Sequence, residues 1–302
     1  MIQHITRLCG HEVPGTLLGI GDDAAVLQPD PQQQLVISTD TLVAEVHFRA
    51  SDPPATVGHK ALAVNFSDMA AMGAKPQWVL LNLTLPTIDV AWLDPFIKGF
   101  AQLLVQHNVQ LVGGDTTQGP LSIGVTVLGQ TPRAITRNGA QVGDCVVVSG
   151  ELGGAAFALQ HPGSDPSCDQ QLQQPTPRLD IATQVQGLAT AMIDLSDGLL
   201  QDLGHLCQAS GVVAELELSQ IPHPPVIRQD PRWQEFMLSG GDDYQLCFTI
   251  NPSDQARLPA DCQVIGVILA DGDADQGRVR VMHQQQAIDT RAGGYQHFTE
   301  AP

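Results

Sequence analysis

Apolar residues recur along the first half of the chain with two spacings, one typical of strands and one typical of helices. Short apolar runs rich in β-prone residues predict strands at 35–39, 78–85, 109–112 and 121–130. Apolar positions three and four residues apart predict helices at 55–72 and 90–107. Strands that alternate with helices are typical of α/β or α+β domains, in which helices cover a sheet.

The second half of the chain repeats this alternation after a stretch rich in Gly, Pro and Arg at 131–144. Apolar runs predict strands at 145–149, 212–218, 245–250 and 264–269, and helical spacing predicts helices near 153–160, 178–189 and 199–210. The Gln- and Pro-rich stretch 161–177 and the Pro-rich stretch 221–232 are predicted to be loops. We therefore expect two domains, at 1–137 and 138–302.

Composition narrows the classes of partner. The chain has 302 residues, 43% of them apolar, which suits a globular protein of about two domains. Its formal net charge of −18 argues against nucleic acid and against anionic membrane surfaces, because both need clustered Lys and Arg. An anionic small molecule is compatible with this charge only where metal ions mediate the contact.

The sequence also indicates a cellular compartment. We expect a cytoplasmic protein, since neither a basic-then-apolar leader nor an apolar run of about 18 residues is present. The six cysteines form no C-x-x-C pair, so we expect buried, reduced thiols rather than disulfides or a zinc site.

Aspartates recur where the predicted strands and helices end, and glycines often flank them. They are Asp22, Asp23, Asp40, Asp68, Asp115, Asp194, Asp197, Asp242 and Asp243. In α/β folds, ligands gather at the carboxyl ends of strands. Carboxylates brought together there at about 4 Å would repel by on the order of 4 kcal/mol per pair at an effective dielectric of 20, so such a site needs divalent cations.

Mg²⁺ takes oxygen ligands and is commonly shared between carboxylates and substrate phosphates, so convergence would give a phosphate site with several metal ions. The alternative is that each aspartate caps its own turn or helix, which fits any single residue better. The regular placement of six or more favours convergence.

Other motifs are rejected. Residues 19–24 match G-x-G-x-x-A, but prolines follow closely and two anions would face a pyrophosphate. Residues 271–277 resemble a calcium loop but lack its sixth-position glycine and closing glutamate, so a hairpin turn is predicted. The chain has no P-loop, and neither Ser38 nor Ser196 has the G-x-S-x-G context of a hydrolase nucleophile.

Taken in order, six segments resemble the thiamine-monophosphate kinases. They are Gly19-Ile-Gly-Asp-Asp23, Ser38-Thr-Asp-Thr-Leu-Val43 with His47-Phe48, Lys60-Ala-Leu-Ala-Val-Asn65 through Gly73-Ala74, Gly113-Gly-Asp-Thr-Thr117, Asp194-Leu-Ser-Asp-Gly-Leu199 and Ser239-Gly-Gly-Asp-Asp-Tyr244. The similarity runs from about Leu18 to Gly294-Tyr-Gln-His-Phe298, nearly the whole chain.

The resemblance implies a two-domain α/β (α+β) fold like that of aminoimidazole ribonucleotide synthetase, with mixed sheets flanked by helices. It implies a homodimer whose N-terminal sheets pair into a barrel. It also implies phosphorylation of thiamine monophosphate to thiamine diphosphate with ATP and several Mg²⁺ ions, the last step of thiamine diphosphate biosynthesis.

Residue roles follow from the same resemblance. The implied metal shell is Asp23, Ser38, Thr39, Asp40, Asp68, Asp115, Asp194 and Asp197. The implied ATP contacts are Gly114, Asp115, Arg137 and Ser196, and the implied thiamine monophosphate contacts are His47, Asp242 and Tyr295. The catalytic set is Asp115, Asp197 and Arg137, while Asp22 is either a second ligand or a turn residue.

The chemistry suits these residue types. The acceptor is a phosphate oxygen that is already ionised near neutral pH, so direct in-line transfer needs charge neutralisation and alignment rather than a general base. Two alternatives are a relative with another phosphoryl acceptor and a metal-binding protein without catalysis. The sequence departs from the family at Glu45, where glycine is common, and at Asp242 and Gln245, where glutamate is frequent.

Overall fold

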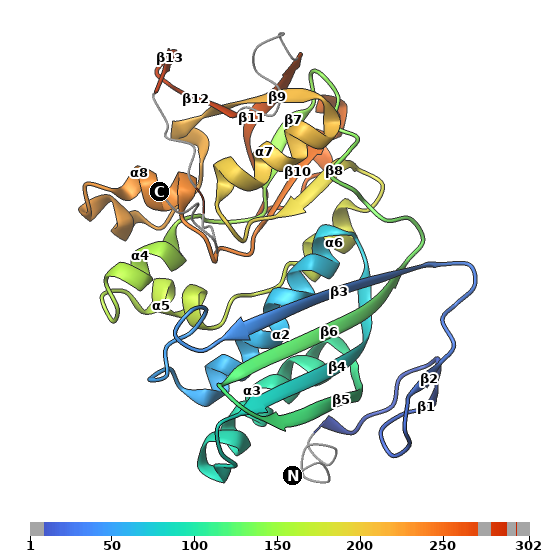
Figure 1. Ribbon diagram of the computed structural model, residues 1–302. Helices are drawn as coiled ribbons and strands as arrows, with labels where there is room; N and C mark the ends of the chain where they lie inside the picture. The colour runs from blue at the N-terminus through green and yellow to red at the C-terminus, as the bar shows by residue number, and fades with distance from the viewer. Residues whose placement is uncertain (1–8, 271–278, 289–293, 295–302) are drawn as a thin grey trace, which may run out of the picture. The chain divides into compact units, whose positions relative to one another are not determined.

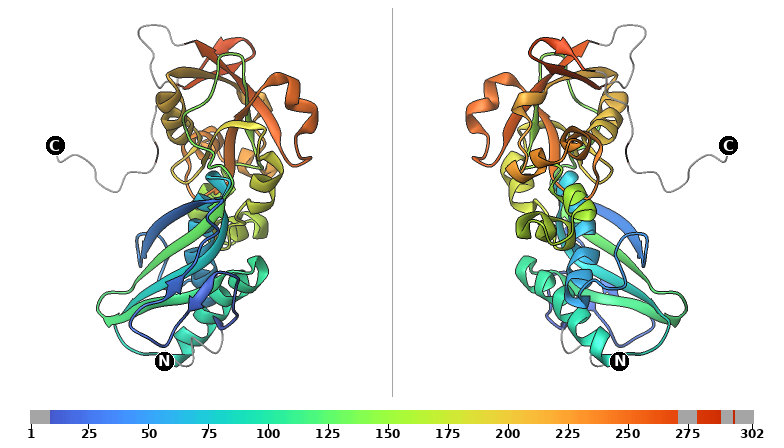
Figure 2. Two further views of the ribbon diagram at one scale, coloured as in Figure 1. Left: turned by 90° about the vertical axis from the view of Figure 1, so that its right-hand side faces the viewer. Right: turned by 90° about the vertical axis from the view of Figure 1, so that its left-hand side faces the viewer.

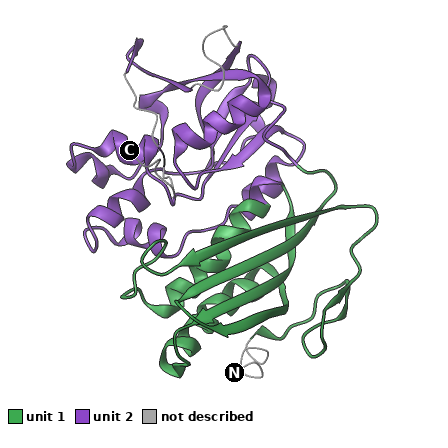
Figure 3. Ribbon diagram, in the orientation of Figure 1, with its two compact units in different colours: residues 1–69, 73–134 green, residues 70–72, 135–302 purple. Residues whose placement is uncertain are grey.

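The computed structural model describes residues 9–270, 279–288 and 294 (Figure 1). The chain forms two compact units (Figure 3). Unit 1 comprises residues 1–69 and 73–134, and unit 2 comprises residues 70–72 and 135–302. This division falls between Ala134 and Ile135, three residues before the boundary expected from the sequence.

Unit 1 contains a four-stranded sheet with helices on one face. Its elements are β1 (Thr16–Leu18), β2 (Val26–Leu27), β3 (Gln34–Val43), α2 (Pro54–Ala71), β4 (Lys75–Leu85), α3 (Val90–His107), β5 (Gln110–Gln118) and β6 (Ser122–Thr131). The sheet order is β3-β6-β4-β5, with β4 and β5 parallel and the other neighbours antiparallel. Helices α2 and α3 cover one face of this sheet (Figure 1), and β1 pairs with β2 separately.

Unit 2 contains a seven-stranded sheet in the order β13-β12-β9-β11-β7-β10-β8. Its strands are β7 (Cys145–Val148), β8 (Ala189–Asp194), β9 (Val212–Glu217), β10 (Leu246–Ile250), β11 (Gln263–Ala270), β12 (Val279–His283) and β13 (Gln286–Ala287). Its helices are α4 (Gly154–Gln160), α5 (Pro166–Gln173), α6 (Leu179–Val185), α7 (Leu199–Ser210) and α8 (Trp233–Ser239). Further views of both sheets are given in Figure 2.

The sheet of unit 2 buries both faces. Val146 and Val148 of β7 pack in one apolar cluster with residues of α7, while Val147 between them packs in another with residues of α6. Successive side chains of a strand point to opposite faces, so this division places a helical layer against each face. A sheet buried in this way needs continuous apolar strands, which is the pattern seen in the sequence.

Most predicted elements are confirmed, and the loop expected at 161–177 is wrong in part because it contains α5. Asp165 begins this helix, where its side chain accepts from the backbone N of Ser167 and of Cys168, and Pro166 follows in the first turn. An acidic residue before proline is a recognised helix start. The Pro-rich stretch 221–232 contains one 3₁₀ turn, η2 (Pro225–Gln229), and another, η1 (Leu218–Gln220), directly precedes it.

All six cysteines are free thiols, four of them buried and two, Cys145 and Cys262, half-buried. The predicted turn at 271–277 lies outside the described residues. In the part of the chain that is described, no helix is long and apolar enough to cross a membrane.

Gly114 is required by the close approach of β5 to β4. Its φ is +140°, and a Cβ at this position would lie 1.9 Å from the carbonyl O of Leu81. We expect Gly114→Ala to lower the free energy of unfolding by about 3 kcal/mol, measured by denaturant titration. Gly124→Ala on β6 is the matched control, because its Cβ would meet Asn82 Cβ at an ordinary 3.5 Å. Equal stability of the two variants would contradict this account.

Candidate functional site

Three of the predicted metal ligands meet in unit 1 between β3 and α2. Ser38 and Asp40 alternate with exposed residues along β3, so both face the helical layer. Asp68 of α2 accepts a 2.5 Å hydrogen bond from Ser38 Oγ. Fully buried Asn65, one turn earlier on α2, accepts from the backbone N of Asp40 at 3.2 Å. We call Ser38, Asp40 and Asp68 the β3–α2 cluster.

The two carboxyl groups of the β3–α2 cluster oppose each other electrostatically. Burial, the charge of Asp68 and a hydrogen bond with Asp68 raise the pKa of Asp40 to about 7. A divalent cation would relieve this repulsion, and the donors available, two carboxylates and a hydroxyl, are all oxygen atoms. This donor set fits Mg²⁺ rather than a softer metal.

Thr39 and Asp115 lie on the other face of the unit 1 sheet. Thr39 is exposed and its Oγ1 lies 3.0 Å from Thr126 Oγ1. Asp115 is exposed, with its backbone N bonded to Asn82 Oδ1 at 2.9 Å. Asp40 is separated from the β5 edge by three inter-strand steps, about 14 Å at about 4.8 Å each. The side chains of Thr39 and Asp115 are therefore not brought to the β3–α2 cluster within unit 1.

The turn that carries Asp22 and Asp23 is exposed. Asp22 Oδ1 accepts from the backbone N of Asp23 at 2.8 Å. Such a bond is typical of a residue that stabilises its own turn, which favours the turn interpretation of Asp22. The carboxylate of Asp23 has no hydrogen bond with any described residue, so its metal role stays a prediction.

His47, a predicted substrate contact, is half-buried in the loop after β3. Its Nδ1 accepts from the backbone N of Val43 at 3.0 Å, so the neutral ring carries its proton on Nε2. Glu45 in the same loop has a φ of +63°, a conformation that glycine adopts freely. The loop therefore takes a glycine-like path despite the larger residue, and Glu45 Oε1 accepts from the backbone N of Ala50 at 2.9 Å.

Two acidic segments lie side by side in unit 2. The backbone N of Asp242 donates to the carbonyl O of Ser196 at 2.9 Å, and the backbone N of Tyr244 donates to that of Leu195 at 2.8 Å. Leu195 in turn donates to the carbonyl O of Gln245 at 2.8 Å. These bonds bring predicted site residues from 194–198 and 239–245 together at one end of β8 and β10.

The two segments of this junction approach each other closely and adopt unusual backbone conformations. Asp242 and Tyr244 have φ values of +67° and +48°, which residues with side chains rarely adopt. A Cβ on Gly198 would lie 2.8 Å from the carbonyl carbon of Ser239, so glycine is required there. Tyr244 OH donates to Asp242 Oδ1 at 3.0 Å, so this carboxylate is held in place although it is shorter than the glutamate frequent in the family. Strained backbone of this kind concentrates at functional sites.

The carboxylates of this junction differ in surroundings. Asp194 ends β8 and is 6% exposed. Asp197 and Ser196 are half-buried, and Asp197 Oδ2 accepts from Gln201 Nε2 at 2.9 Å. Asp243 is buried, and both of its oxygens accept from the backbone N of Gly153 at the start of α4, at 3.0 and 2.9 Å. Burial raises the pKa of Asp243, whose carboxyl group serves the start of α4.

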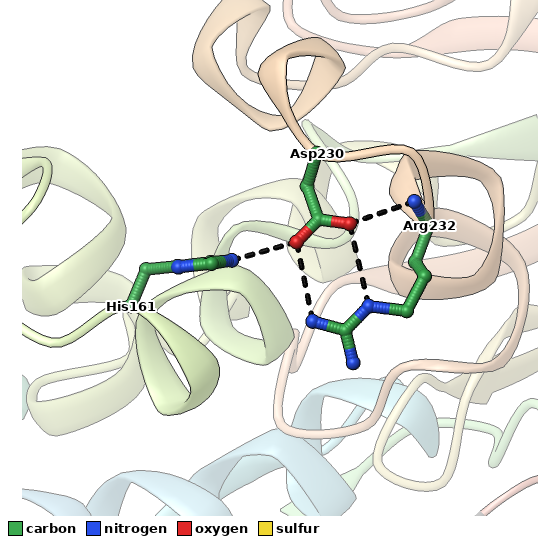
Figure 4. Close-up of polar contacts among 3 residues, drawn as sticks. All are labelled: His161, Asp230 and Arg232. Carbon is green, nitrogen blue, oxygen red and sulfur yellow. Dashed lines mark hydrogen bonds and ion pairs between the residues drawn. The ribbon is translucent and has the colours of Figure 1, made fainter.

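Ion pairs near this junction hold α4 and α8. Asp230 Oδ2 bonds to His161 Nε2 at 2.7 Å and to Arg232 Nη2 at 3.1 Å (Figure 4). Hydrogen bonds from Arg232 and His161 lower the pKa of Asp230. His161 ends α4 and Arg232 begins α8, the helix that leads into the segment 239–245. The carboxylate therefore ties together the two helices that support the junction.

The remaining predicted residues are less constrained. Arg137 is exposed, and its carbonyl O accepts from Ser210 Oγ at 2.9 Å. Tyr295 lies outside the described residues, but its neighbour Gly294 packs against Asp197, since a Cβ there would lie 2.7 Å from the carbonyl O of Asp197. Sequence reasoning did not find Arg178, whose Nε donates to buried Gln245 Oε1 at 2.7 Å beside the same junction.

Within the described residues, no group of three or more His, Cys, Asp or Glu side chains is placed to hold a metal ion. The β3–α2 cluster supplies two carboxylates. A cation bound there would need further oxygen ligands, and Mg²⁺ commonly takes these from water and substrate phosphates.

Comparison with known proteins defines the class. The N-terminal domain of the AIR synthase related proteins matches residues 21–131, and their C-terminal domain matches residues 141–275. The thiamine-monophosphate kinase of Haemophilus influenzae is 39% identical over 94% of this chain and 92% of its own length. The crystal structure of thiamine-monophosphate kinase from Stenotrophomonas maltophilia K279a is 40% identical, with a TM-score of 0.84, over 95% of this chain and 96% of that chain.

A structure of AaThiL complexed with AMPPCP and TMP is 31% identical, with a TM-score of 0.78, over 98% of this chain and 96% of that chain. These similarities confirm the two-domain AIR synthase-like fold with mixed sheets and helices. The chain belongs to the thiamine-monophosphate kinases of the AIR synthase related family.

Proposed function

We propose that this protein transfers the γ-phosphoryl group of ATP to thiamine monophosphate, giving ADP and thiamine diphosphate, with Mg²⁺. The observation that carries the proposal is the hydrogen-bonded junction of 194–198 with 239–245, which joins Asp194, Asp197 and Asp242. AaThiL, with the same fold, bound AMPPCP and TMP together. The reaction is the last step of thiamine diphosphate biosynthesis.

Phosphoryl transfer between two polyanions requires alignment and charge neutralisation. When bound, Mg²⁺ would neutralise phosphate charge. The ligands assigned to it are Asp23, Ser38, Thr39, Asp40, Asp68, Asp115, Asp194 and Asp197. In this proposal ATP is bound by Gly114, Arg137 and Ser196. Arg137 contributes a positive charge, which is scarce in a chain with 14 Lys and Arg against 32 Asp and Glu.

The acceptor side is formed by His47, Asp242 and Tyr295 in the proposal. Tyr244 fixes the carboxylate of Asp242, and the backbone N of Val43 holds the ring of His47 through Nδ1. Transfer is direct, because the sequence offers no motif for a covalent phosphorylated intermediate. A phosphorylated enzyme trapped from labelled ATP in the absence of acceptor would contradict direct transfer.

The identity of the phosphoryl acceptor can be tested by measuring the rate of ADP release. With ATP and Mg²⁺, thiamine monophosphate should stimulate ADP release well above the rate without acceptor, whereas unphosphorylated thiamine should not. Stimulation by another phosphorylated compound but not by thiamine monophosphate would indicate a relative with a different acceptor. No ATP turnover with or without any acceptor, together with Mn²⁺ binding, would indicate the metal-binding protein without catalysis.

We also propose a homodimer formed through the face of the unit 1 sheet opposite its helices. On β3 this face exposes apolar side chains, with Ile37 59%, Leu35 43% and Val43 36% exposed. Exposed apolar residues gathered on one sheet face are typical of an interface. The proposed compartment is the cytoplasm, which suits six free thiols.

The dimer gives a direct prediction. Ile37→Lys should shift the protein from dimer to monomer in sedimentation velocity, because a buried lysine at the sheet interface leaves an uncompensated charge. Val105→Lys on α3 is the matched control, since Val105 is 65% exposed on the helical layer. Two variants of identical mass in solution would show that this sheet face is not the interface.

A further inference from the structure

Helix α7 (Leu199–Ser210) begins two residues after the predicted metal ligand Asp197, and Gly198 precedes its first residue. Gly198 is the N-cap and has no side chain with which to accept from the first backbone N–H groups. Glycine is nevertheless required, because its φ is +120° and a Cβ would lie 2.8 Å from the carbonyl O of Ser239. The close approach of the two acidic segments therefore removes the usual cap of α7.

Asp202 supplies the missing acceptor from inside the helix. Its Oδ2 accepts from the backbone N of Asp197 at 3.0 Å and from that of Gly198 at 3.1 Å. Asp202 is 4% exposed, so solvent does not compete for these bonds. The adjacent Gln201 donates to the carboxylate of Asp197 at 2.9 Å. Two consecutive residues of α7 therefore hold Asp197. Asp202 binds the backbone of Asp197, and Gln201 binds its carboxylate.

We infer that Asp202 is a positioning residue for the metal-binding carboxylate of Asp197, acting as a hydrogen-bond acceptor and not as a ligand. The inference rests on the proposed metal role of Asp197. Groups that orient metal ligands commonly contribute 10–100-fold to metal affinity. The bonds from the backbone N of Asp197 and of Gly198 both go to Oδ2 of Asp202, and the backbone of Ser196 is a further hydrogen-bond partner of this carboxylate. An asparagine carbonyl oxygen can keep the two bonds to Oδ2, whereas a longer carboxylate would displace that oxygen.

The test measures Mn²⁺ binding to the full-length protein by electron paramagnetic resonance of free Mn²⁺. Asp197→Asn identifies the affinity that belongs to this site. Asp202→Asn should stay within about twofold of the wild-type Mn²⁺ affinity, while Asp202→Ala and Asp202→Glu should weaken it about tenfold. Tighter Mn²⁺ binding in Asp202→Asn than in Asp202→Glu separates positioning from a charge effect, because glutamate keeps the charge and asparagine does not. This comparison remains valid if the alanine variant does not fold.

Asp144→Ala provides the control for losing a buried carboxylate. Asp144 is 2% exposed, and its Oδ2 accepts from Gln141 N at 2.9 Å and Thr190 Oγ1 at 2.7 Å. Thr190 lies four residues before Asp194 on β8, about 13 Å away at about 3.3 Å per residue. This variant should lower the melting temperature without changing Mn²⁺ affinity.

Three results would overturn the inference. They are wild-type Mn²⁺ affinity in folded Asp202→Ala, weaker binding in Asp202→Asn than in Asp202→Glu, and equal weakening in Asp144→Ala. Unchanged Mn²⁺ binding in Asp197→Asn would overturn the metal role of Asp197 and this inference with it. Turnover of thiamine monophosphate by the wild-type protein tests the proposed function separately.

Discussion

Asp115→Asn should lower kcat about a thousandfold, which corresponds to about 4 kcal/mol of transition-state stabilisation. The substitution removes one negative charge from the proposed metal shell while keeping the shape of the side chain. Asp115 is exposed near the end of β5, and its Oδ1 accepts from the backbone N of Thr116, a bond that the asparagine carbonyl can still accept. Steady-state kinetics at saturating ATP and thiamine monophosphate measure the effect.

The fold of this variant should be intact, because Asp115 is exposed and Asn82 bonds its backbone N rather than its carboxylate. Circular dichroism and thermal melting would verify this. Asp261→Asn is the matched control, since Asp261 is exposed in unit 2 and outside the proposed site. Near-normal kcat in Asp115→Asn would exclude Asp115 as a metal ligand.

Removal of Mg²⁺ should abolish turnover. Two polyanionic substrates must approach in a protein of net charge −18, and each pair of like charges at about 4 Å costs on the order of 4 kcal/mol at an effective dielectric of 20. Excess EDTA should take the rate of thiamine diphosphate formation below detection, and restored free Mg²⁺ should recover it. Turnover that persists in EDTA would contradict the metal assignment.

Mg²⁺ should also stabilise the protein without substrates. The β3–α2 cluster places Asp40 beside Asp68, and a cation bound there would offset their repulsion. Mg²⁺ at about 100 times its dissociation constant should raise the free energy of unfolding by about 2.7 kcal/mol, measured by denaturant titration. Asp68→Asn should reduce this gain, while Asp261→Asn should leave it unchanged.

The sequence predicted the elements well where packing imposes a regular spacing. The helix expected at 90–107 has these bounds in the structure, because its apolar face is continuous and Asn108 ends it in a left-handed conformation. Helix α5 was missed although Asp165 and Pro166 mark its start, since its Gln-rich surface gives little apolar periodicity. The Gln- and Pro-rich composition of 161–177 led to the prediction of a loop, although Asp165 is a clear helix cap.

The acidic motifs show how far the candidate site could be predicted from the sequence. Ser38 and Asp40 face Asp68 because they are two residues apart on a strand, and the same period sends the side chain of Thr39 to the other face. The two-residue period of a strand would have been enough to assign Ser38 and Asp40 to one face of the sheet and Thr39 to the other. Asp22 follows the alternative in which an aspartate serves its own turn. Asp243 instead accepts from the backbone N of Gly153, 90 residues away at the start of α4.

Other features depended on contacts between distant segments. Asn65 bonds to the backbone of Asp40 across 25 residues, and Arg178 bonds to Gln245 across 67. Neither pairing leaves a local pattern in the sequence. The role of Asp202 was hidden for a related reason, because the need for a cap inside α7 arises only when Gly198 approaches Ser239.

The central claim is most directly tested by a single turnover with excess enzyme, γ-labelled ATP, Mg²⁺ and thiamine monophosphate. Rapid quenching and separation should show the label passing from ATP to thiamine diphosphate without accumulating on the protein. Label that appears only in inorganic phosphate, or remains in ATP while the folded protein binds both substrates, would contradict the proposed function.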